Sequence, residues 1–455
     1  MDIEDLEPKK QQPPKKDLEV MSIEALGEYI EDLEAEIARV RDAIKLKEAG
    51  YNDFVIFEQS DDIGGTWHQN HYPGCACDVQ SALYSFSFEQ NPNWSRMYAQ
   101  QHEIKAYLKH CAEKYGLMKH IRLNTHVAGA RFDENHQRWV VETCDSPALW
   151  AYMQERGVKP GDRLDRTDRG LPEFTTLRAD ILVSGMGGLS TPAYPEIEGI
   201  ESFTGKRFHS QDWDHDYDLR GKRVAVIGTG ASAIQFVPEV AKQAARVDLY
   251  QRTPPWIMPK PDRAIRPLEK RLFRMFPQTL NAFRQSIYWS LEARVLGFVG
   301  NPRILKLGEL QARRHIRNQI PDKALRRKVT PDFHFGCKRV LISNNYYPAL
   351  AQDHVDVVTE GIREVQGNTV IDGQGNKRQV DCIIYGTGFR AQDPIPAGMI
   401  FGRNSQDLLD AWKDGAEAYK GTTISGFPNF FMLMGPNTGL GHSSMVYMIE
   451  SQIQY

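Results

Sequence analysis

Several features are scarce or missing in this chain of 455 residues, and each absence excludes a class of protein. No apolar stretch reaches the roughly 18 residues that a membrane-spanning helix needs. The chain opens with the polar run Met1 to Asp5, which is no secretory signal. The net charge is only −3 and no long basic run occurs outside the N-terminus, so the composition does not suggest binding to nucleic acid.

Cysteine is also scarce, with six residues scattered over the chain. This usage fits a reduced cytoplasm better than a disulfide framework, so we expect a cytoplasmic protein. Cys75-x-Cys77 is at best half of a metal site, and no second pair follows at a suitable spacing. We therefore predict that the chain holds no metal.

The first fifty residues contain only two glycines, Gly27 and Gly50, and no apolar strand. Residues 1–20 are charged and contain Pro and Lys, which predicts a disordered tail. Apolar residues then alternate in steps of three and four, which is typical of a coiled coil, at Ile23, Leu26, Ile30, Leu33, Ile37, Val40 and Ile44. A helix over 23–44 could join copies into a homo-oligomer, or it could lie as a single amphipathic helix on the protein. The segment resembles small bacterial coiled-coil proteins of unknown function.

From residue 45 onward, short apolar strands alternate with helices. Strands are expected within 54–58, 120–142, 178–186, 221–250 and 380–389, and residues 262–330 have helical spacing. This alternation predicts an α/β protein with parallel sheets, and the length predicts two or three domains.

A glycine turn follows the apolar strand 224–227 and opens a helix expected over 231–241. Its residues are Gly228, Thr229, Gly230, Ala231, Ser232 and Ala233. Such a turn lets the backbone approach a pyrophosphate, and the helix N-terminus offers free N–H groups. The next strand ends at Arg252-Thr253, where an arginine can pair with the 2′-phosphate of NADP. We therefore predict NADPH binding. The alternatives are that the glycine turn is only structural and that Arg252 is an ordinary surface residue.

Six motifs occur in a fixed order. The most informative is F-x-G-x-x-x-H-x-x-x-W-D, formed by Phe203, Gly205, His209, Trp213 and Asp214. The others are Gly64-Gly65-Thr66-Trp67, the run from Tyr72 to Asp78, Gly336-Cys337-Lys338-Arg339, Gly386-Thr387-Gly388-Phe389, and the run from Gly435 to His442. Together they make residues 45–455 resemble the type I Baeyer–Villiger monooxygenases of the flavin-containing monooxygenase superfamily.

The resemblance implies FAD and NADPH as cofactors, and a small-molecule ketone and dioxygen as substrates. One oxygen atom would enter the ketone through a flavin peroxide and give an ester or lactone. Flavin-binding positions would be Glu58, Gly64, Gly65, Thr66, Trp67, Asp78, Tyr84, Val127 and Met445. NADP-binding positions would be Gly228, Thr229, Gly230, Ala231, Ser232, Ala233, Gln235, Arg252, Thr253, Lys338 and Arg339.

The resemblance makes Arg339 the catalytic arginine and Asp78 the acid that positions it. A cation there would stabilise negative charge in a dry pocket, where such interactions are strong. The alternative is that Arg339 forms only an ordinary salt bridge. His209 and Trp213 would lie on the connection between the domains and respond to nicotinamide binding.

The chain departs from the family at both ends. Family members begin with a strand and a G-x-G-x-x-G turn for the flavin, which the coiled-coil segment replaces here, and they continue beyond the final helix. The first strand of a doubly wound sheet is central. Without it, each buried N–H or C=O group left unpaired costs about 1–3 kcal/mol.

These features predict two dinucleotide-binding, Rossmann-like domains with a helical insert. Residues 1–44 would form the tail and the coiled-coil-like helix, 45–215 and 380–455 an incomplete FAD-binding domain, and 216–379 the NADPH-binding domain with its insert at 262–330. Two other functions stay open. An N- or S-oxygenating flavin monooxygenase is disfavoured by Trp213-Asp214. An inactive NADP-binding remnant tethered to a coiled coil is the non-enzymatic alternative.

Overall fold

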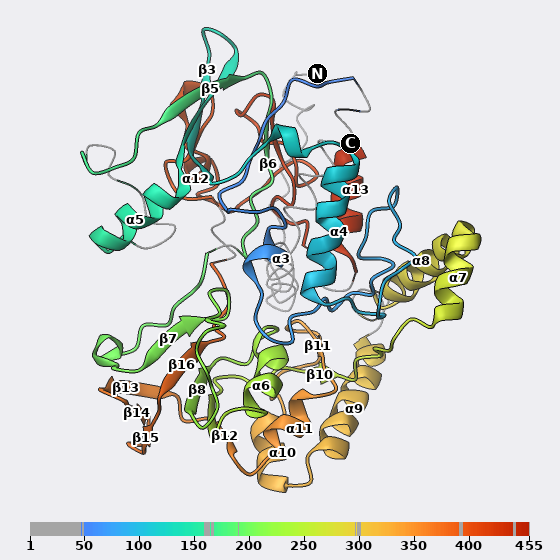
Figure 1. The fold of residues 1–455 in the computed structure, drawn as a ribbon, viewed down its shortest axis with the longest axis vertical. Helices are drawn as coiled ribbons and strands as arrows, with labels where there is room; N and C mark the ends of the chain where they lie inside the picture. Colours follow the sequence, from blue (N-terminus) through green and yellow to red (C-terminus); the bar gives the residue numbers. More distant parts are fainter. Residues whose placement is uncertain are drawn as a thin grey trace, which may run out of the picture.

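The computed structural model describes Lys47 and residues 50–455, apart from gaps at 159–163, 165–167, 190, 296, 298–301, 391–394, 440–442 and 455. The coiled-coil prediction for residues 23–44 lies outside the described residues. Figure 1 shows two groups of strands, one around β7, β8 and β16 and the other around β3, β5 and β6, with helices α3, α4 and α13 between and beside them.

The first group of strands is a five-stranded parallel sheet in the order β12-β9-β8-β16-β7. Its strands are β7 (Lys206–His209), β8 (Arg223–Ile227), β9 (Arg246–Tyr250), β12 (Val355–Val358) and β16 (Cys382–Tyr385). The central strands are buried on both faces, as expected for a parallel sheet covered by helices. Helix α6 (Ala233–Ala241) connects β8 to β9 and begins two residues later than predicted. The predicted α/β fold is confirmed.

The described residues of the helical insert form four helices, α7 (Pro267–Met275), α8 (Pro277–Glu292), α9 (Pro302–Gln319) and α10 (Lys323–Val329). Proline opens α7 and α8 at the first position, where the missing N–H has no intrahelical partner to lose. The carboxylate of Asp322 accepts from Leu325 N at 2.6 Å and caps α10. Short strands β10 (Ile257–Met258) and β11 (Leu341–Ile342) pair in parallel on either side of the insert.

The second group contains a four-stranded sheet in the order β17-β3-β4-β5. Its strands are β3 (Thr125–Asp133), β4 (Arg138–Asp145), β5 (Thr175–Ala179) and β17 (Ile400–Phe401). Three further strands, β13 (Ile362–Gln366), β14 (Thr369–Asp372) and β15 (Lys377–Gln379), form an antiparallel meander between β12 and β16 in the chain. The other helices of the described ranges are α3 (Thr66–Gln69), α4 (Gln101–Lys114), α5 (Ser146–Arg156), α11 (Tyr346–Leu350), α12 (Leu408–Ala411) and α13 (Met445–Gln454), with single 3₁₀ turns at Met118–His120, Ile200–Ser202 and Arg403–Ser405.

The predicted flavin-binding part holds two separate pairs of parallel strands instead of one wide sheet. Strand β1 (Ile56–Phe57), shorter than the predicted 54–58, pairs with β2 (Ile121–Arg122). Strand β6 (Leu182–Ser184) pairs with β18 (Phe430–Met432). Among the described residues no strand joins the two pairs.

A single hydrophobic cluster connects the two parts of the protein. It extends from Trp67, Tyr84 and Trp94 into Val224 and Ile384 of the five-stranded sheet. The loops between β1 and α4 therefore pack directly on the dinucleotide-binding part. Within the described ranges, no helix combines the length and the apolar character needed to cross a membrane.

Candidate functional site

The predicted NADP turn lies where the parallel strands β8 and β9 end. Gly228 has a φ of 106°, and an added Cβ would meet Gly386 O at 2.3 Å, so the close approach of two turns requires glycine here. Thr229 donates its hydroxyl hydrogen to Thr253 O at 3.1 Å, which ties the turn to the end of β9. Gly230 and Arg252 are exposed beside it. This edge, with the N-terminus of α6, can receive a pyrophosphate and a 2′-phosphate.

Gln235 on α6 makes a contact that the sequence did not predict. Its side-chain amide donates to Ala76 O at 2.9 Å, and its oxygen accepts from Tyr72 OH at 3.0 Å and from Ala76 N at 3.3 Å. An added Cβ on Gly74 would meet Gln235 O at 2.7 Å, so the loop lies close against the helix. The side chain assigned to NADP thus bonds to the loop 72–78 of the other part.

Asp78, at the end of that loop, forms an ion pair with Arg339, which precedes β11. The exposed fractions of the two side chains are 21% for Asp78 and 12% for Arg339, so water reaches the pair only partly. The structure thereby brings together the two predicted catalytic residues. Lys338 points elsewhere: it is exposed, and its ammonium lies 4.9 Å from the centre of the Phe333 ring.

A second cation next to Asp78 was missed from the sequence. Lys260 follows β10, and its ammonium donates to Cys77 O at 3.1 Å and lies 4.9 Å above the Tyr98 ring. Burial lowers the pKa of Lys260, while the charge of Asp78 opposes that shift. The side-chain amide of Asn344 bonds to both N and O of the Lys260 backbone, at 2.9 and 2.7 Å. The only signal in the sequence is a lysine set between Pro259 and Pro261.

Two aromatic residues predicted to contact the flavin contact each other. Trp67 Nε1 donates to Tyr84 OH at 3.0 Å, and the rings meet edge to face with centroids 5.7 Å apart. Trp67 belongs to α3, whose start is formed by Gly64 and Gly65 with φ values of 125° and 47°. Met445 begins α13 and is 1% exposed.

A buried ion pair, also missed from the sequence, fixes α13 against the Tyr84 segment. Arg284 of α8 lies 3.3 Å from Glu450 of α13, with side chains 4% and 6% exposed. Arg284 also donates to the carbonyls of Ala82, Leu83 and Ser85, and burial lowers its pKa to about 10. Glu450 in turn accepts from the backbone and hydroxyl of Ser87 at 2.8 and 2.9 Å.

The predicted flavin-binding part encloses a cavity of about 990 Å³, large enough for a cofactor. Glu58, Gly65, Thr66 and Val127, all predicted flavin-binding positions, line it. Glu58 is 3% exposed, follows β1 and accepts from Ser60 N at 2.9 Å. A carboxylate at this strand end is suited to ribose hydroxyls. The residues present therefore fit the adenosine half of FAD. The described residues contain no glycine turn at the start of this part that could bind the pyrophosphate of FAD.

The fingerprint residues connect the two parts. His209 ends β7 and is fully buried; Gln211 N donates to its Nδ1 at 3.1 Å, so its Nε2–H donates to Gly388 O at 3.0 Å. Burial lowers the pKa of His209 to about 4, which keeps the ring neutral. Trp213 packs against Phe236 of α6 with ring centres 5.4 Å apart.

The other fingerprint residues have local roles. An added Cβ on Gly205 would meet Asp381 O at 2.4 Å, and Phe203 is buried. Asp214 pairs with Lys206 and accepts from the N–H groups of two following residues. Just beyond, His215 bonds to His71 of the flavin-binding part at 2.8 Å. The fingerprint residues thus lie close to contacts between the two parts.

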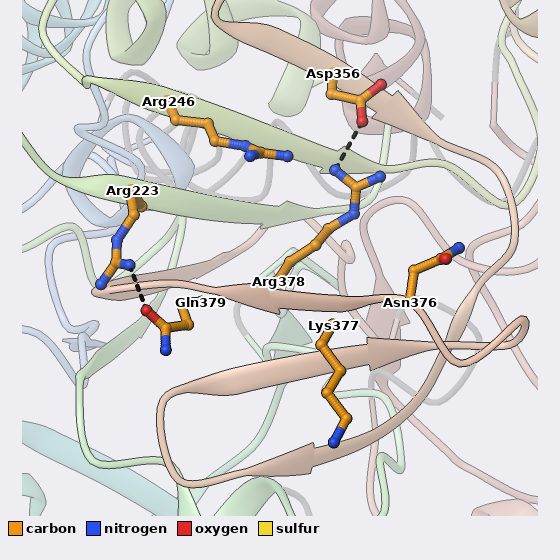
Figure 2. A pocket seen from close by; sticks show the side chains of 7 residues that line it. All are labelled: Arg223, Arg246, Asp356, Asn376, Lys377, Arg378 and Gln379. Carbon is orange, nitrogen blue, oxygen red and sulfur yellow. Dashed lines mark hydrogen bonds and ion pairs between the residues drawn. The ribbon is translucent and has the colours of Figure 1, made fainter.

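A separate hollow of about 530 Å³, where β8 and β9 begin, contains none of the predicted site residues. Figure 2 shows Arg378 bonded to Asp356 and Arg223 bonded to Gln379, at 2.7 and 2.9 Å, and Arg246 pairs with Asp248 at 2.9 Å. Arg378 also contacts the buried Asp248. Because these charges are paired, the hollow is not a second candidate site.

Comparisons with known proteins agree with this geometry. A Baeyer–Villiger monooxygenase of Pseudomonas aeruginosa is 57% identical over 413 residues, which cover 91% of this chain and 73% of that protein. One from Streptomyces coelicolor is 45% identical over 414 residues, 91% of this chain and 74% of the relative. This chain belongs to the Baeyer–Villiger monooxygenases.

Matches to family models and to a solved structure support this membership. A flavin-binding monooxygenase-like family matches residues 179–297, and an NAD(P)-binding Rossmann-like domain matches 43–100. A family of proteins of unknown function (DUF1192) matches residues 4–52. A crystal structure of OTEMO in complex with FAD and NADP is 28% identical, with a TM-score of 0.75 over 92% of this chain and 82% of that chain. FAD and NADPH are thus the cofactors of this monooxygenase family, as predicted.

The buried pair predicts a large loss of stability when one partner is removed. Arg284→Met leaves the Glu450 carboxylate buried without its cation, which typically costs about 3–5 kcal/mol. Urea unfolding should show this loss, and the double change Arg284→Met with Glu450→Leu should recover much of it. Arg317→Met, on the exposed side of α9, is the matched control and should change little. Equal effects of Arg284→Met and Arg317→Met would contradict the role of the pair.

The low pKa of His209 predicts an acid-sensitive fold. The unfolded chain protonates this ring near 6.5 and the folded protein near 4, so the unfolded state binds more protons between these values. Stability is therefore lost as pH falls through this window, by about 2 kcal/mol between pH 7 and pH 5. Unfolding curves of His209→Gln should lack this part of the slope, whereas the exposed His136→Gln should keep it. Identical slopes in all three proteins would show that His209 titrates normally.

Proposed function

We propose that the chain inserts one oxygen atom of dioxygen into a ketone to give an ester or lactone, with Arg339 as the catalytic residue and Asp78 as its positioning partner. The observation that carries this assignment is the Asp78–Arg339 ion pair. It forms across the junction of the two nucleotide-binding parts, between residues that are 261 positions apart. Bound FAD would supply the reaction of dioxygen.

The contribution of the chain itself is electrostatic. A guanidinium is always protonated and offers several N–H donors in one plane. Asp78 fixes that plane, and Lys260 holds the adjacent Cys77 carbonyl, so the donors need little rearrangement during the reaction. Preorganised donors in a partly water-excluded site stabilise negative charge that develops on the reacting oxygen and on the substrate carbonyl.

We also propose the cofactor-binding residues that the family resemblance implies. Glu58 and Val127 would hold the adenosine half of FAD beside the cavity, and Trp67, Tyr84 and Met445 its ring end. Gly228 to Ala233 with Arg252 and Thr253 would hold NADPH at the end of the five-stranded sheet. The domain limits given above remain part of this proposal, except that β7 and β16, outside 216–379, belong to the five-stranded sheet assigned to NADPH. A cytoplasmic location and a homo-oligomer through 23–44 are proposed as well.

One observation favours a second candidate, an NADP-binding remnant without flavin. The pairs β1–β2 and β6–β18 are separate, and the turn that would bind the flavin pyrophosphate is not among the described residues.

A visible absorption spectrum of the purified full chain distinguishes the two functions. The monooxygenase should show flavin absorption and, with NADPH and ¹⁸O₂, convert ketones to esters that contain one ¹⁸O atom. A colourless, folded protein that binds NADPH would instead identify the remnant. Whether or not the protein contains flavin, titration with NADPH tests separately whether the turn Gly228–Ala233 binds the nucleotide.

Replacing the arginine should separate two steps of turnover. In Arg339→Ala, the flavin absorbance should still bleach when NADPH is added, because the glycine turn and Arg252 are intact. Ester formation should fall by about 100-fold or more, as expected when a stabilising donor is lost. Stopped-flow absorbance and product analysis measure the two steps, and Arg317→Ala, which removes an exposed arginine of α9, is the control. Unchanged ester formation in Arg339→Ala would refute the catalytic assignment.

A further inference from the structure

The helical insert carries a charge opposite to that of the rest of the chain. Residues 262–330 contain sixteen Lys and Arg against five Asp and Glu, a net charge of +11. The whole chain has a net charge of −3, so the remaining residues carry −14. Such segregation produces a local positive field that attracts anionic partners.

Apolar side chains are exposed within this basic region, at the hairpin of α7 and α8. Leu268, Leu272, Met275 and Phe276 have exposed fractions of 76%, 43%, 56% and 50%. Leu268, Leu272 and Met275 are spaced by four and three residues, so they lie on one face of α7. The opposite face is anchored, because Phe273 is buried and stacks on Phe283 of α8 with ring centres 5.7 Å apart.

Cations accompany this apolar face. Arg271 and Arg274 of α7 are exposed, and no carboxylate of the described residues pairs with either side chain. The one acid of α7, Glu269, is occupied by Arg263 at 2.7 Å and by the backbone N–H of Arg266 at 2.8 Å. The hairpin therefore presents apolar groups and uncompensated positive charge together.

The shape of the region decides which partner it suits. Figure 1 shows α7 and α8, in yellow, projecting from the edge of the molecule beyond the sheets. The hairpin itself, residues 267–292, has four basic and two acidic residues and a net charge of +2. A second copy would bring two positive surfaces together, which like-charge repulsion opposes. A helix that projects with Leu, Met and Phe beside Arg is instead suited to the boundary of an anionic bilayer, where the apolar groups enter and the cations contact headgroups. Trp289 on α8, 66% exposed, adds an aromatic ring of the kind found at such boundaries.

We propose that the α7–α8 hairpin is a peripheral docking surface for an anionic lipid membrane. The hairpin lies on the surface without spanning it, and it holds the protein where apolar ketones partition. This surface is independent of the reaction assigned to Arg339.

Vesicle sedimentation with the full chain tests the proposal. The protein should pellet with vesicles of phosphatidylcholine and phosphatidylglycerol, much less with phosphatidylcholine alone, and high salt should weaken the binding. The double change Leu272→Ser with Met275→Ser should weaken binding about tenfold or more, because the inserted apolar area is lost. Ile181→Ser, which alters an exposed aliphatic residue of the other part, should bind like the unchanged protein.

Three results would overturn the proposal. Equal pelleting with both kinds of vesicle would show that binding does not depend on anionic headgroups. Unchanged pelleting of the double variant would show that the apolar face of α7 does not contact the membrane. A dimer on sizing that the double variant loses, without binding to either vesicle, would identify the face as a contact between copies. Thermal melting of every variant shows that an altered result does not come from unfolding.

Discussion

The ion pair between Asp78 and Arg339 is the contact on which the assigned chemistry depends, and much of the junction serves to hold it. The loop 72–78 is bound from the NADPH side by Gln235 of α6 and by Lys260 after β10. Arg339 reaches the same loop from the start of β11. Each contact comes from a different element of the dinucleotide-binding part, so the loop cannot move without breaking several bonds.

Among the residues that the structure describes, β1–β2 and β6–β18 are separate strand pairs, which makes the shared core more important. A doubly wound sheet normally gains its rigidity from a central strand that bonds on both sides. Here the flavin-binding loops pack instead on the five-stranded sheet through one continuous hydrophobic cluster. The buried pair of Arg284 and Glu450 adds a second attachment, because it fixes α13 to the segment that carries Tyr84. Both attachments hold predicted flavin contacts in place from outside the flavin-binding sheet.

The sequence predicted the features whose signal is local. The glycine turn at Gly228, the strand before it and the helix after it are adjacent in the chain, so their pattern is visible without a structure. The family motifs likewise indicated the pairing of Asp78 with Arg339. Lys260 and Arg284 could not be found in this way, since their partners lie 183 and 166 residues away. A lysine between prolines and an arginine in an amphipathic helix look like surface residues until the fold buries them. Gln235 was predicted to bind NADP, but its amide bonds to the loop 72–78. This contact also joins residues far apart in the chain, so only the packing of the fold shows it.

A double-mutant cycle on the ion pair tests the central claim most directly. The rate of ester formation would be measured for the unchanged protein, Asp78→Ala, Arg339→Ala and the double variant, with flavin content determined for each. If Asp78 acts only by positioning Arg339, the double variant should be no slower than Arg339→Ala, so the two losses are far from additive. Additive losses would contradict the account, because they would mean that the two residues act independently.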